Sequence, residues 1–424
     1  MAGRWRSGGW RALLCLPLAA ALCVTALSGC GAVPAPDDPE GRDGRAVQRM
    51  LDQRAAAVRN RDAEAFLATV DRGSAGYRAE QRRVFRQMSA VPLDSWTYRL
   101  VRTGGFEPAR VTGRRLAAQV ELRYRLKGYD TAPLVSAQYL TLAQRGGRWY
   151  VANDDGVVDG KRGLQQLWDQ GTVDVVRGAH SLVLGVGQDR RVLRALADTA
   201  DRAVPALDRV WPHAWAGRVV VEVPASLGHM AALLGASADG YRGIAAVTTG
   251  EVGGSGDEAP ADRVIVNPEA YQVLGDFGRN VVITHETAHV ATRTATTAAT
   301  PLWLSEGFAD WVGYRAPGRP PRQVAPELAE AVAAGHLPAA LPRDDDFRFG
   351  SDSDSLSRAY EQGWLACRLI ADRWGEKKLV EFYRTVGRAP ERAGAVESAL
   401  DEVLGMNLAD FTALWRKYVA SKLD

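Results

Sequence analysis

The stretch His285-Glu286-Thr287-Ala288-His289 is the point around which this chain of 424 residues is organised. Residues 281–292 predict a helix, and histidines four positions apart lie above one another on one face of a helix. Two imidazoles at this spacing can bind one Zn²⁺, and Glu286 between them can take a proton from a water molecule at the metal. A tetrahedral zinc site with one open position needs a third protein ligand, which must come from elsewhere in the chain.

A second stretch, Trp303-Leu304-Ser305-Glu306-Gly307-Phe308-Ala309-Asp310-Trp311, offers that ligand. It predicts a second helix, which Thr300 is expected to cap and Pro301 to open at its first position. We expect Glu306 to be the third zinc ligand. Asp310 lies one turn later on the same face and is expected to accept a hydrogen bond from a ligand histidine. The alternative is a helix whose two histidines bind no metal. The second motif, in a chain with only six histidines, argues against that alternative.

Two motifs in this part of the chain resemble those of the gluzincin metallopeptidases, the superfamily that includes thermolysin-like enzymes and aminopeptidase N. His285-Glu286-x-x-His289, with Glu306 in a Trp-Leu-x-Glu-Gly-Phe-Ala context, is close to the aminopeptidase N pattern. Ala359-Tyr360-Glu361-Gln362-Gly363 resembles the Tyr-Glu-Lys-Gly segment of that branch. The resemblance covers residues 178–424, and the spacing between His289 and Glu306 is slightly shorter than in aminopeptidase N.

This resemblance implies a peptidase mechanism with a role for each motif residue. His285, His289 and Glu306 would hold Zn²⁺. Glu286 would act as general base and then pass its proton to the leaving amine. Tyr360 would donate a hydrogen bond to the oxyanion, and the alternative is that Tyr360 only packs on a helix face.

The expected fold class is α+β, and residues 46–160 are expected to form a small α+β domain of their own. Helical spacing at 47–58 and a helix starting at Asp62 come first. Strand-like runs follow at 96–101, 116–126 and 135–143, and the turn 145–148 leads into a further run at 149–151. Helices followed by a curved antiparallel sheet resemble the nuclear-transport-factor-2-like (NTF2-like) fold. Because this segment contains no histidine, we expect a structural or partner-binding role, with a ligand pocket in the sheet as the alternative.

For residues 178–424, the gluzincin resemblance implies a mixed sheet that leads into the zinc helix and then a mostly helical C-terminal subdomain. The apolar pattern predicts strands at 182–184, 219–223, 244–249 and 263–267, and helices at 190–210 and 227–234. Residues 250–262 are rich in glycine and acids and predict a surface loop. Further helices are predicted at 326–334, 356–374, 377–386 and within 393–423. Gly375 is expected to end the second of these.

The strand Gly243-Ile244-Ala245-Ala246-Val247-Thr248 bears on the choice of substrate. Aminopeptidase N carries a Gly-x-Met-Glu-Asn segment at the corresponding edge strand, and its glutamate grips the free amine of the substrate. This sequence has no acid there, so we expect an endopeptidase whose edge strand pairs with an extended peptide. The rival hypothesis is a non-catalytic surface lipoprotein that uses a peptidase-like domain for binding or envelope assembly. The intact Glu286 argues against it, because a domain kept only for binding needs no general base.

Residues 1–30 predict an export signal, in which three arginines precede the apolar segment 12–27. Its end, Leu27-Ser28-Gly29-Cys30, resembles the bacterial lipobox, which implies cleavage before Cys30 and a lipid on its thiol. The alternative is a simple secretory signal with an incidental cysteine. Residues 31–45 predict a polar tether. The expected location is therefore the extracytoplasmic face of the cell membrane, as a lipid-anchored bacterial lipoprotein.

Net charge and cysteine usage limit the possible partners and the possible disulfides. The net charge is +3 and the arginines are spread along the chain, which argues against a nucleic-acid partner. Cys15 and Cys23 would leave with the signal, so we expect no intramolecular disulfide and a buried, inert thiol at Cys367. The expected partners are a peptide or protein substrate, the membrane through Cys30, and an unknown partner or ligand of the first domain.

Overall fold

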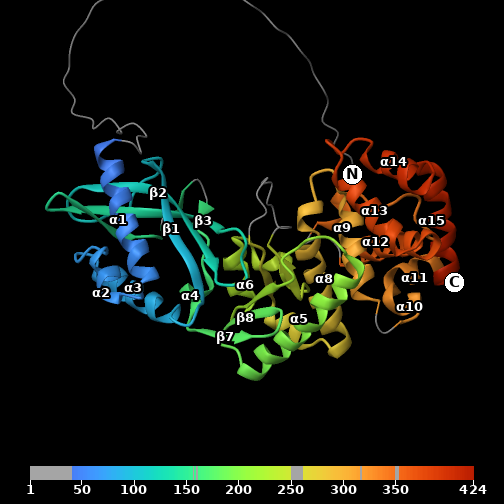
Figure 1. The fold of residues 1–424 in the computed structure, drawn as a ribbon, viewed down its shortest axis with the longest axis horizontal. Coiled ribbons are helices and arrows are strands. Elements are labelled where there is room, and N and C mark those ends of the chain that lie inside the picture. Colours follow the sequence, from blue (N-terminus) through green and yellow to red (C-terminus); the bar gives the residue numbers. More distant parts are fainter. Residues whose placement is uncertain (1–40, 156, 159–160, 250–260, 316–317, 349–352) are drawn as a thin grey trace, which may run out of the picture. The chain divides into compact units, whose positions relative to one another are not determined.

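The structure is a computed structural model that describes residues 41–155, 157–158, 161–249, 261–315, 318–348 and 353–424. Residues from Asp37 onward form one compact unit. This unit is of mixed α and β structure, with two larger sheets, one two-stranded sheet (β5, Val157–Val158; β6, Lys161–Arg162) and a helical C-terminal part (Figure 1). The predicted export signal, Cys30 and most of the predicted loop 250–262 lie outside the described residues.

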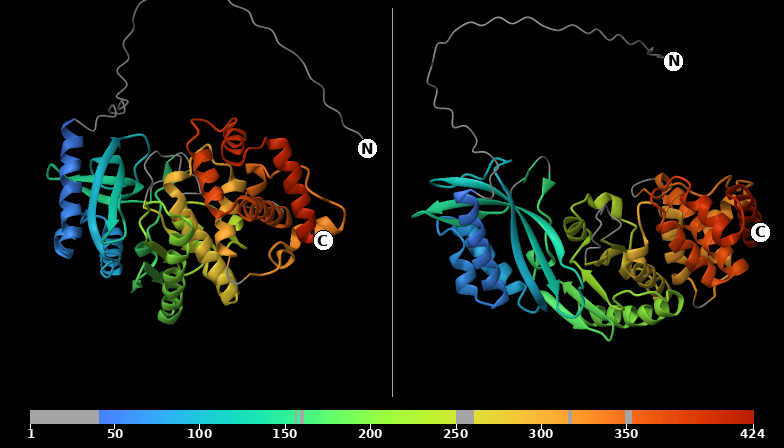
Figure 2. Two further views of the ribbon diagram at one scale, coloured as in Figure 1. Left: turned by 45° about the vertical axis from the view of Figure 1, so that its right-hand side comes forward. Right: turned by 45° about the horizontal axis from the view of Figure 1, so that its top comes forward.

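The first sheet is an antiparallel meander of four strands, which follow one another in sequence order. They are β1 (Leu93–Thr103), β2 (Arg115–Leu126), β3 (Leu134–Arg145) and β4 (Arg148–Asn153). On β2 the alternate residues Val120, Leu122, Tyr124 and Leu126 are each at most 2% exposed, which confirms the predicted half-buried strand. The long strands bend along their length (Figure 2). This region is thus the antiparallel sheet that the sequence predicts, while its NTF2-like identity remains a prediction.

Three helices precede this sheet: α1 (Arg42–Arg59), α2 (Ala63–Ala68) and α3 (Ala75–Gln87). Helix α1 begins four residues inside the predicted tether and packs against β1 and β4. Helix α3 was not expected from the sequence. Its buried side chains Tyr77, Gln81 and Val84 share one face, but only two of them are apolar, and the periodic signal is correspondingly weak.

The second sheet is mixed and has five strands. Its order is β10 (Ala246–Thr248), β11 (Val264–Val266), β9 (Val219–Val223), β8 (Ser181–Val186) and β7 (Val173–Arg177). The inner strands β8, β9 and β11 are parallel, and the outer strands pair antiparallel with their neighbours. The sequence predicts all of these strands except β7. Helix α5 (Arg190–Val210) packs on β7, β8 and β9, and α6 (Leu227–Leu234) follows β9.

One cluster of buried side chains joins the two sheets. It includes Trp96 and Tyr124 from the first sheet and Leu182 and Val220 from the second. Between them, Trp168 of the short helix α4 (Leu167–Gln170) packs against both Trp96 and Tyr124, with ring centroids 5.6 and 5.2 Å apart. The division into domains at 46–160 and 178–424 remains a prediction. The buried cluster contains side chains from both of these segments.

The rest of the chain is mostly helical. The helices are α7 (Pro268–Gln272), α8 (Asp276–Thr292), α9 (Leu302–Gly313), α10 (Pro321–Val324), α11 (Pro326–Ala333), α12 (Ser353–Trp374), α13 (Glu376–Gly387), α14 (Ala395–Ala399) and α15 (Leu408–Leu423). Gly375 separates α12 from α13 with a φ of 92°, as predicted. Cys367 is fully buried in the core of this part, which confirms the expected burial of its thiol. Within the described ranges, no helix is both long enough and apolar enough to cross a membrane.

Candidate metal centre and active site

Helix α8 places both histidines of the motif on one face. The helix starts after Gly275, carries Asp276 in its first turn and runs to Thr292, so it extends beyond the predicted 281–292 at its N-terminal end. His289 and Glu286 are buried, at 3% and 6% exposure. Two polar side chains buried side by side on a helix need partners of their own, which come from α9 for His289 and from β10 for Glu286.

Three ligand atoms, one from each predicted zinc ligand, converge between α8 and α9. His285 Nε2 lies 3.0 Å from His289 Nε2 and 3.2 Å from Oε2 of Glu306, and His289 Nε2 lies 3.6 Å from the same oxygen. Two ligands about 2.0 Å from a tetrahedral ion are roughly 3.3 Å apart, which is the middle of this range. Elsewhere among the described residues, no other group of three His, Cys, Asp or Glu side chains meets in this way.

One ligand atom of the site lacks a hydrogen-bond donor, and a bound cation would satisfy it. Oε2 of Glu306 is buried, and no hydrogen-bond donor reaches it with acceptable geometry. Burial alone would raise the pKa of Glu306, but the two imidazoles hold it well below its ordinary value. Burial likewise disfavours the charged form of His285, but Asp310 and Glu306 outweigh this effect and raise its pKa. The pocket therefore stabilises positive charge, and two neutral imidazoles with one carboxylate are the ligands that Zn²⁺ accepts.

Asp310 lies where the sequence predicts it. Its Oδ1 is 2.8 Å from Nδ1 of His285, on the side of the ring opposite Nε2. A carboxylate in this position favours the tautomer with a proton on Nδ1 and leaves Nε2 free as a ligand atom. The spacing of one helical turn between Glu306 and Asp310 is therefore what allows both carboxylates to act on the same imidazole.

The start of α9 differs from the prediction. The helix begins at Leu302, with Pro301 as its N-cap residue, and Thr300 does not cap it. Thr300 Oγ1 instead accepts a hydrogen bond from the backbone of Thr297. The free N–H of Leu302 donates to Oδ1 of Asp344 at 2.9 Å. A distant carboxylate thus replaces the expected local cap.

Two motif glycines explain how α12 comes close to α9. A Cβ atom on Gly363 would lie 2.7 Å from the carbonyl oxygen of Trp303, and a Cβ on Gly307 would collide with the backbone of Gly363. The two helices can therefore approach closely only because both positions lack side chains. The Gly residues of the Trp-Leu-x-Glu-Gly and Tyr-x-x-Gly motifs are in this way packing residues that bring α12 to the metal centre.

This approach brings Tyr360 to the edge of the site. Its ring centroid is 6.3 Å from that of His285, and it packs edge-on against Phe347 at 5.2 Å. Tyr360 is half-buried, so its hydroxyl is not sealed in the core. The neighbouring Glu361 has a different task. Its carboxylate accepts the backbone N–H groups of Leu328 and Glu327, at 2.6 and 3.3 Å, and so caps α11.

Sequence reasoning did not identify Thr248, which holds the candidate general base. Thr248 Oγ1 lies 2.7 Å from Oε2 of Glu286 and 3.2 Å from the carbonyl oxygen of the same residue, and Thr248 is fully buried. Thr248 ends β10, the edge strand of the mixed sheet, beyond which no described strand pairs. The edge strand and the base are therefore in direct contact.

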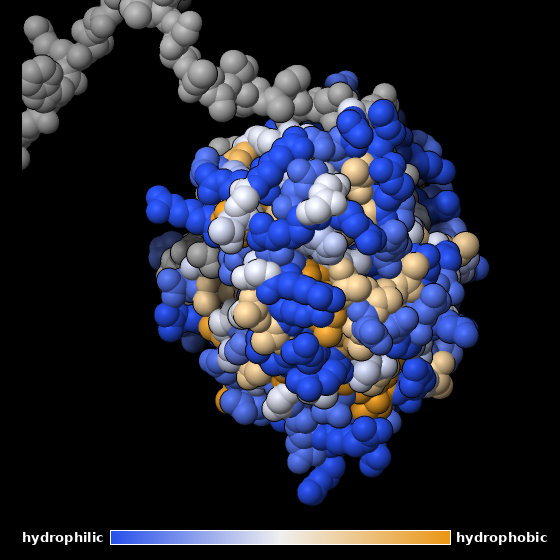
Figure 3. All heavy atoms as spheres, turned by 90° about the vertical axis from the view of Figure 1, so that its left-hand side faces the viewer, coloured by the Kyte–Doolittle hydropathy of each residue, from blue (hydrophilic) through white to orange (hydrophobic). Residues whose placement is uncertain are grey.

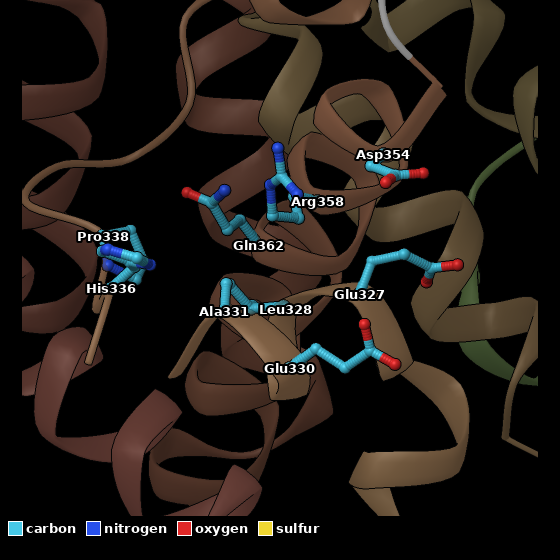
Figure 4. A pocket seen from close by; sticks show the side chains of 9 residues that line it. All are labelled: Glu327, Leu328, Glu330, Ala331, His336, Pro338, Asp354, Arg358 and Gln362. Atoms are coloured by element: carbon cyan, nitrogen blue, oxygen red, sulfur yellow. The ribbon is translucent and has the colours of Figure 1, made fainter. Parts of the chain in front are cut away.

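Several hollows on the molecule lie away from these residues. One cavity of about 450 Å³ is bounded by α11 and α12, and Glu327, Arg358 and Gln362 are among the residues that line it (Figure 4). None of the three ligand residues, nor Glu286 or Tyr360, lines this cavity. The candidate metal centre is recognised by its converging polar atoms.

No family model matches this chain, and a search of curated proteins finds no match. Solved structures give distant similarities. An M1 zinc metallopeptidase from Deinococcus radiodurans is 15% identical over 66% of this chain and 59% of its own, with a TM-score of 0.33. A mutant M1 zinc metallopeptidase from the same organism, bound to a Tyr-Ser-Ala substrate, is 14% identical over the same shares, with a TM-score of 0.33. A two-domain M1 zinc metallopeptidase mutant bound to L-arginine is 13% identical over 67% and 58%, with a TM-score of 0.32. This chain spans less than two thirds of these proteins, and at this similarity residue roles rest on the geometry of the site.

Proposed function

We propose that this protein is a zinc-dependent metallopeptidase that hydrolyses peptide bonds as an endopeptidase. The observation that carries the proposal is the convergence of His285 Nε2, His289 Nε2 and Glu306 Oε2, with Glu286 held on the same helix. The three ligands leave a fourth tetrahedral position for a water molecule or substrate.

Each of the other side chains at the site has a role in the proposed reaction. A Zn²⁺ ion at these ligands would provide Lewis-acid chemistry, which polarises a carbonyl and lowers the pKa of water. Glu286 takes the proton of the attacking water and delivers it to the leaving amine. Thr248 fixes the Glu286 carboxylate through its hydroxyl, and Asp310 fixes the ring of His285. Tyr360 donates its O–H to the oxyanion that forms on the peptide carbonyl.

The edge strand supports an extended peptide as the substrate. β10 pairs with β11 on one side only, and its residues Ala246–Thr248 lead directly to Glu286. An extended chain can add to such an edge through backbone hydrogen bonds. The strand offers no carboxylate to bind a free α-amine, and this favours cleavage within chains.

Hydrolysis by a Glu286→Gln variant tests the proposal. With internally quenched peptides or casein, we expect the wild type to cleave and the variant to lose about 10²–10⁴-fold in kcat while keeping its zinc. Glu330→Gln, which alters an exposed carboxylate on α11, is the control and should cleave normally. Equal turnover by wild type and Glu286→Gln would contradict the role of Glu286 as general base. No turnover by a zinc-loaded wild type on a broad peptide library would support the non-catalytic binding role.

We further propose that a lipid on Cys30 anchors the protein to the outer face of the cell membrane. The support is the Leu27-Ser28-Gly29-Cys30 sequence at the end of an apolar segment. Metabolic labelling with a clickable fatty acid should mark the wild type, whereas Cys30→Ser should remain unlabelled. Labelling that persists in Cys30→Ser would exclude this anchor.

A further inference from the structure

The net charge of this chain is divided unequally along its length. Residues 42–153 contain twenty-one Arg and Lys against ten Asp and Glu, a net charge of +11. Residues 154–424 contain twenty-nine Arg and Lys against thirty-seven Asp and Glu, a net charge of −8. The small net charge of the whole protein therefore conceals a basic N-terminal region beside an acidic remainder. An even distribution of arginines does not imply an even distribution of net charge.

The structure gathers part of this positive charge in one groove. Two adjoining hollows, of about 470 and 570 Å³, lie where α1 and α2 meet β4, and both are lined by Ala68, Arg148 and Tyr150. Arg49 of α1 lines one of them and Arg72, just after α2, the other. We call the two hollows together the basic groove. The face of the molecule around α1 and the first sheet is covered mainly by hydrophilic side chains, with a smaller apolar area among them (Figure 3).

The arginines of the basic groove are available to a partner. Arg49, Arg72 and Arg148 are exposed, and none of them forms an ion pair with a described residue. The acids of the groove are already in use. Asp71 is 1% exposed and held by Arg145 at 2.9 Å, and Asp62 caps α2 through the N–H of Ala65. Asp62 keeps its negative charge, but the three exposed arginines outnumber it, so the groove is positive on balance.

We propose that the basic groove binds the anionic headgroups of a phospholipid membrane. Guanidinium groups match phosphate oxygens with paired hydrogen bonds, and clustered basic residues are attracted to anionic lipid surfaces. The position in the chain favours a membrane over other polyanions. Helix α1 begins at Arg42, and the eleven residues between it and Cys30 can span at most about 40 Å. The basic groove thus lies on the part of the fold closest along the chain to the predicted lipid. A lipid chain and a basic patch together anchor a protein more stably than one signal alone.

Vesicle binding by residues 37–424, the whole compact unit without the lipid, tests this proposal independently of peptidase activity. We expect binding to phosphatidylcholine vesicles that contain phosphatidylglycerol, no binding to pure phosphatidylcholine, and weaker binding as salt is raised. Each arginine contributes roughly a fivefold gain, so Arg49→Gln/Arg72→Gln/Arg148→Gln should weaken binding by about a hundredfold.

The matched control removes the same charge elsewhere. Arg190→Gln/Arg194→Gln/Arg209→Gln alters three exposed arginines of α5 and should bind vesicles like the wild type. Circular dichroism and the zinc content show whether each variant is folded. Three results would overturn the proposal: no binding to anionic vesicles, equal loss in both triple variants, or displacement of the protein from vesicles by a nucleic acid of matched charge.

Discussion

The region of the first sheet and the region of α8 and α9 treat charged side chains in opposite ways. In the first, the buried guanidinium of Arg54 donates to Thr69 Oγ1 at 3.1 Å and to Gln81, and the surplus positive charge stays outside. In the second, Glu286, His289 and Glu306 are all buried close together, and Oε2 of Glu306 has no donor. Buried polar groups in proteins are normally satisfied. Single buried atoms such as Trp96 Nε1 also lack a partner in the first region, but among the described residues only the second region brings three metal-ligand atoms together, which favours a bound cation there.

After Glu286, the largest expected effect in the second region concerns Tyr360, whose hydroxyl distinguishes a working peptidase from a site that only binds zinc. Tyr360→Phe keeps the ring and its contact with Phe347, so folding and zinc content should hardly change. If the hydroxyl donates to the oxyanion, kcat and kcat/KM should fall together by about a hundredfold with KM nearly constant. Steady-state kinetics on a cleaved peptide measures this. A wild-type kcat would show that Tyr360 only packs.

Replacement of Asp310 should lower the affinity for zinc rather than the rate of the chemical step. Asp310→Asn weakens the hydrogen bond to Nδ1 of His285, which is now 2.8 Å, so the ring is less well oriented and less basic. We expect zinc affinity to fall about ten- to a hundredfold in a competition with a chromogenic chelator. Asp372→Asn, an acid of α12 that binds Tyr418, serves as the control. Unchanged affinity in Asp310→Asn would mean that the two helices alone position the ring.

Thr248 links the edge strand to the base, and its effect should be smaller. Thr248→Val keeps the shape of the side chain but removes the hydroxyl that lies 2.7 Å from Glu286 Oε2. We expect kcat to fall about tenfold with KM and zinc content nearly unchanged, and Thr248→Ser to restore most of the activity. If Thr248→Ser were as impaired as Thr248→Val, packing of the methyl group and not the hydrogen bond would be responsible.

The smallest expected effect concerns a buried acid that binds no ligand. Burial, with a hydrogen bond that protonated Glu361 donates to Glu327, raises the pKa of Glu361 to about 9 from an ordinary value of 4.5. Between these values the folded state keeps a proton that the unfolded state loses, so stability falls as the pH rises through this window. Glu361→Gln should flatten this dependence and stabilise the protein by about 1 kcal/mol near pH 8. Urea unfolding at pH 5 and pH 8 measures both curves, and parallel curves would contradict the assignment.

The parts of the site that the sequence predicts are those with a repeat along one helix. His285 and His289 share a face of α8, and Glu306 and Asp310 share a face of α9, so a spacing of four identifies both pairs. Residue spacing also predicts β2, in which buried and less buried residues alternate, and α5, whose predicted and observed bounds agree. Regular local patterns were thus sufficient for most elements.

The contacts that the sequence does not predict join residues far apart in the chain. Thr248 meets Glu286 only because β10 lies at the edge of the sheet beside α8, and nothing near Thr248 indicates this. Asp344, 42 positions away in the chain, accepts the N–H of Leu302, so the local cap expected from Thr300 was wrong. The close approach at Gly307 and Gly363 likewise depends on the crossing of two helices. Such contacts are set by tertiary packing, which residue spacing does not encode.

Zinc stoichiometry tests the central claim most directly. Elemental analysis of the purified protein should give about one Zn²⁺ per chain for the wild type and for Glu286→Gln. His285→Ala, His289→Ala and Glu306→Ala should each have lost the metal, while circular dichroism shows that they remain folded. Retention of one zinc ion by all three ligand variants, or a folded wild type that binds none, would contradict the metal centre between α8 and α9.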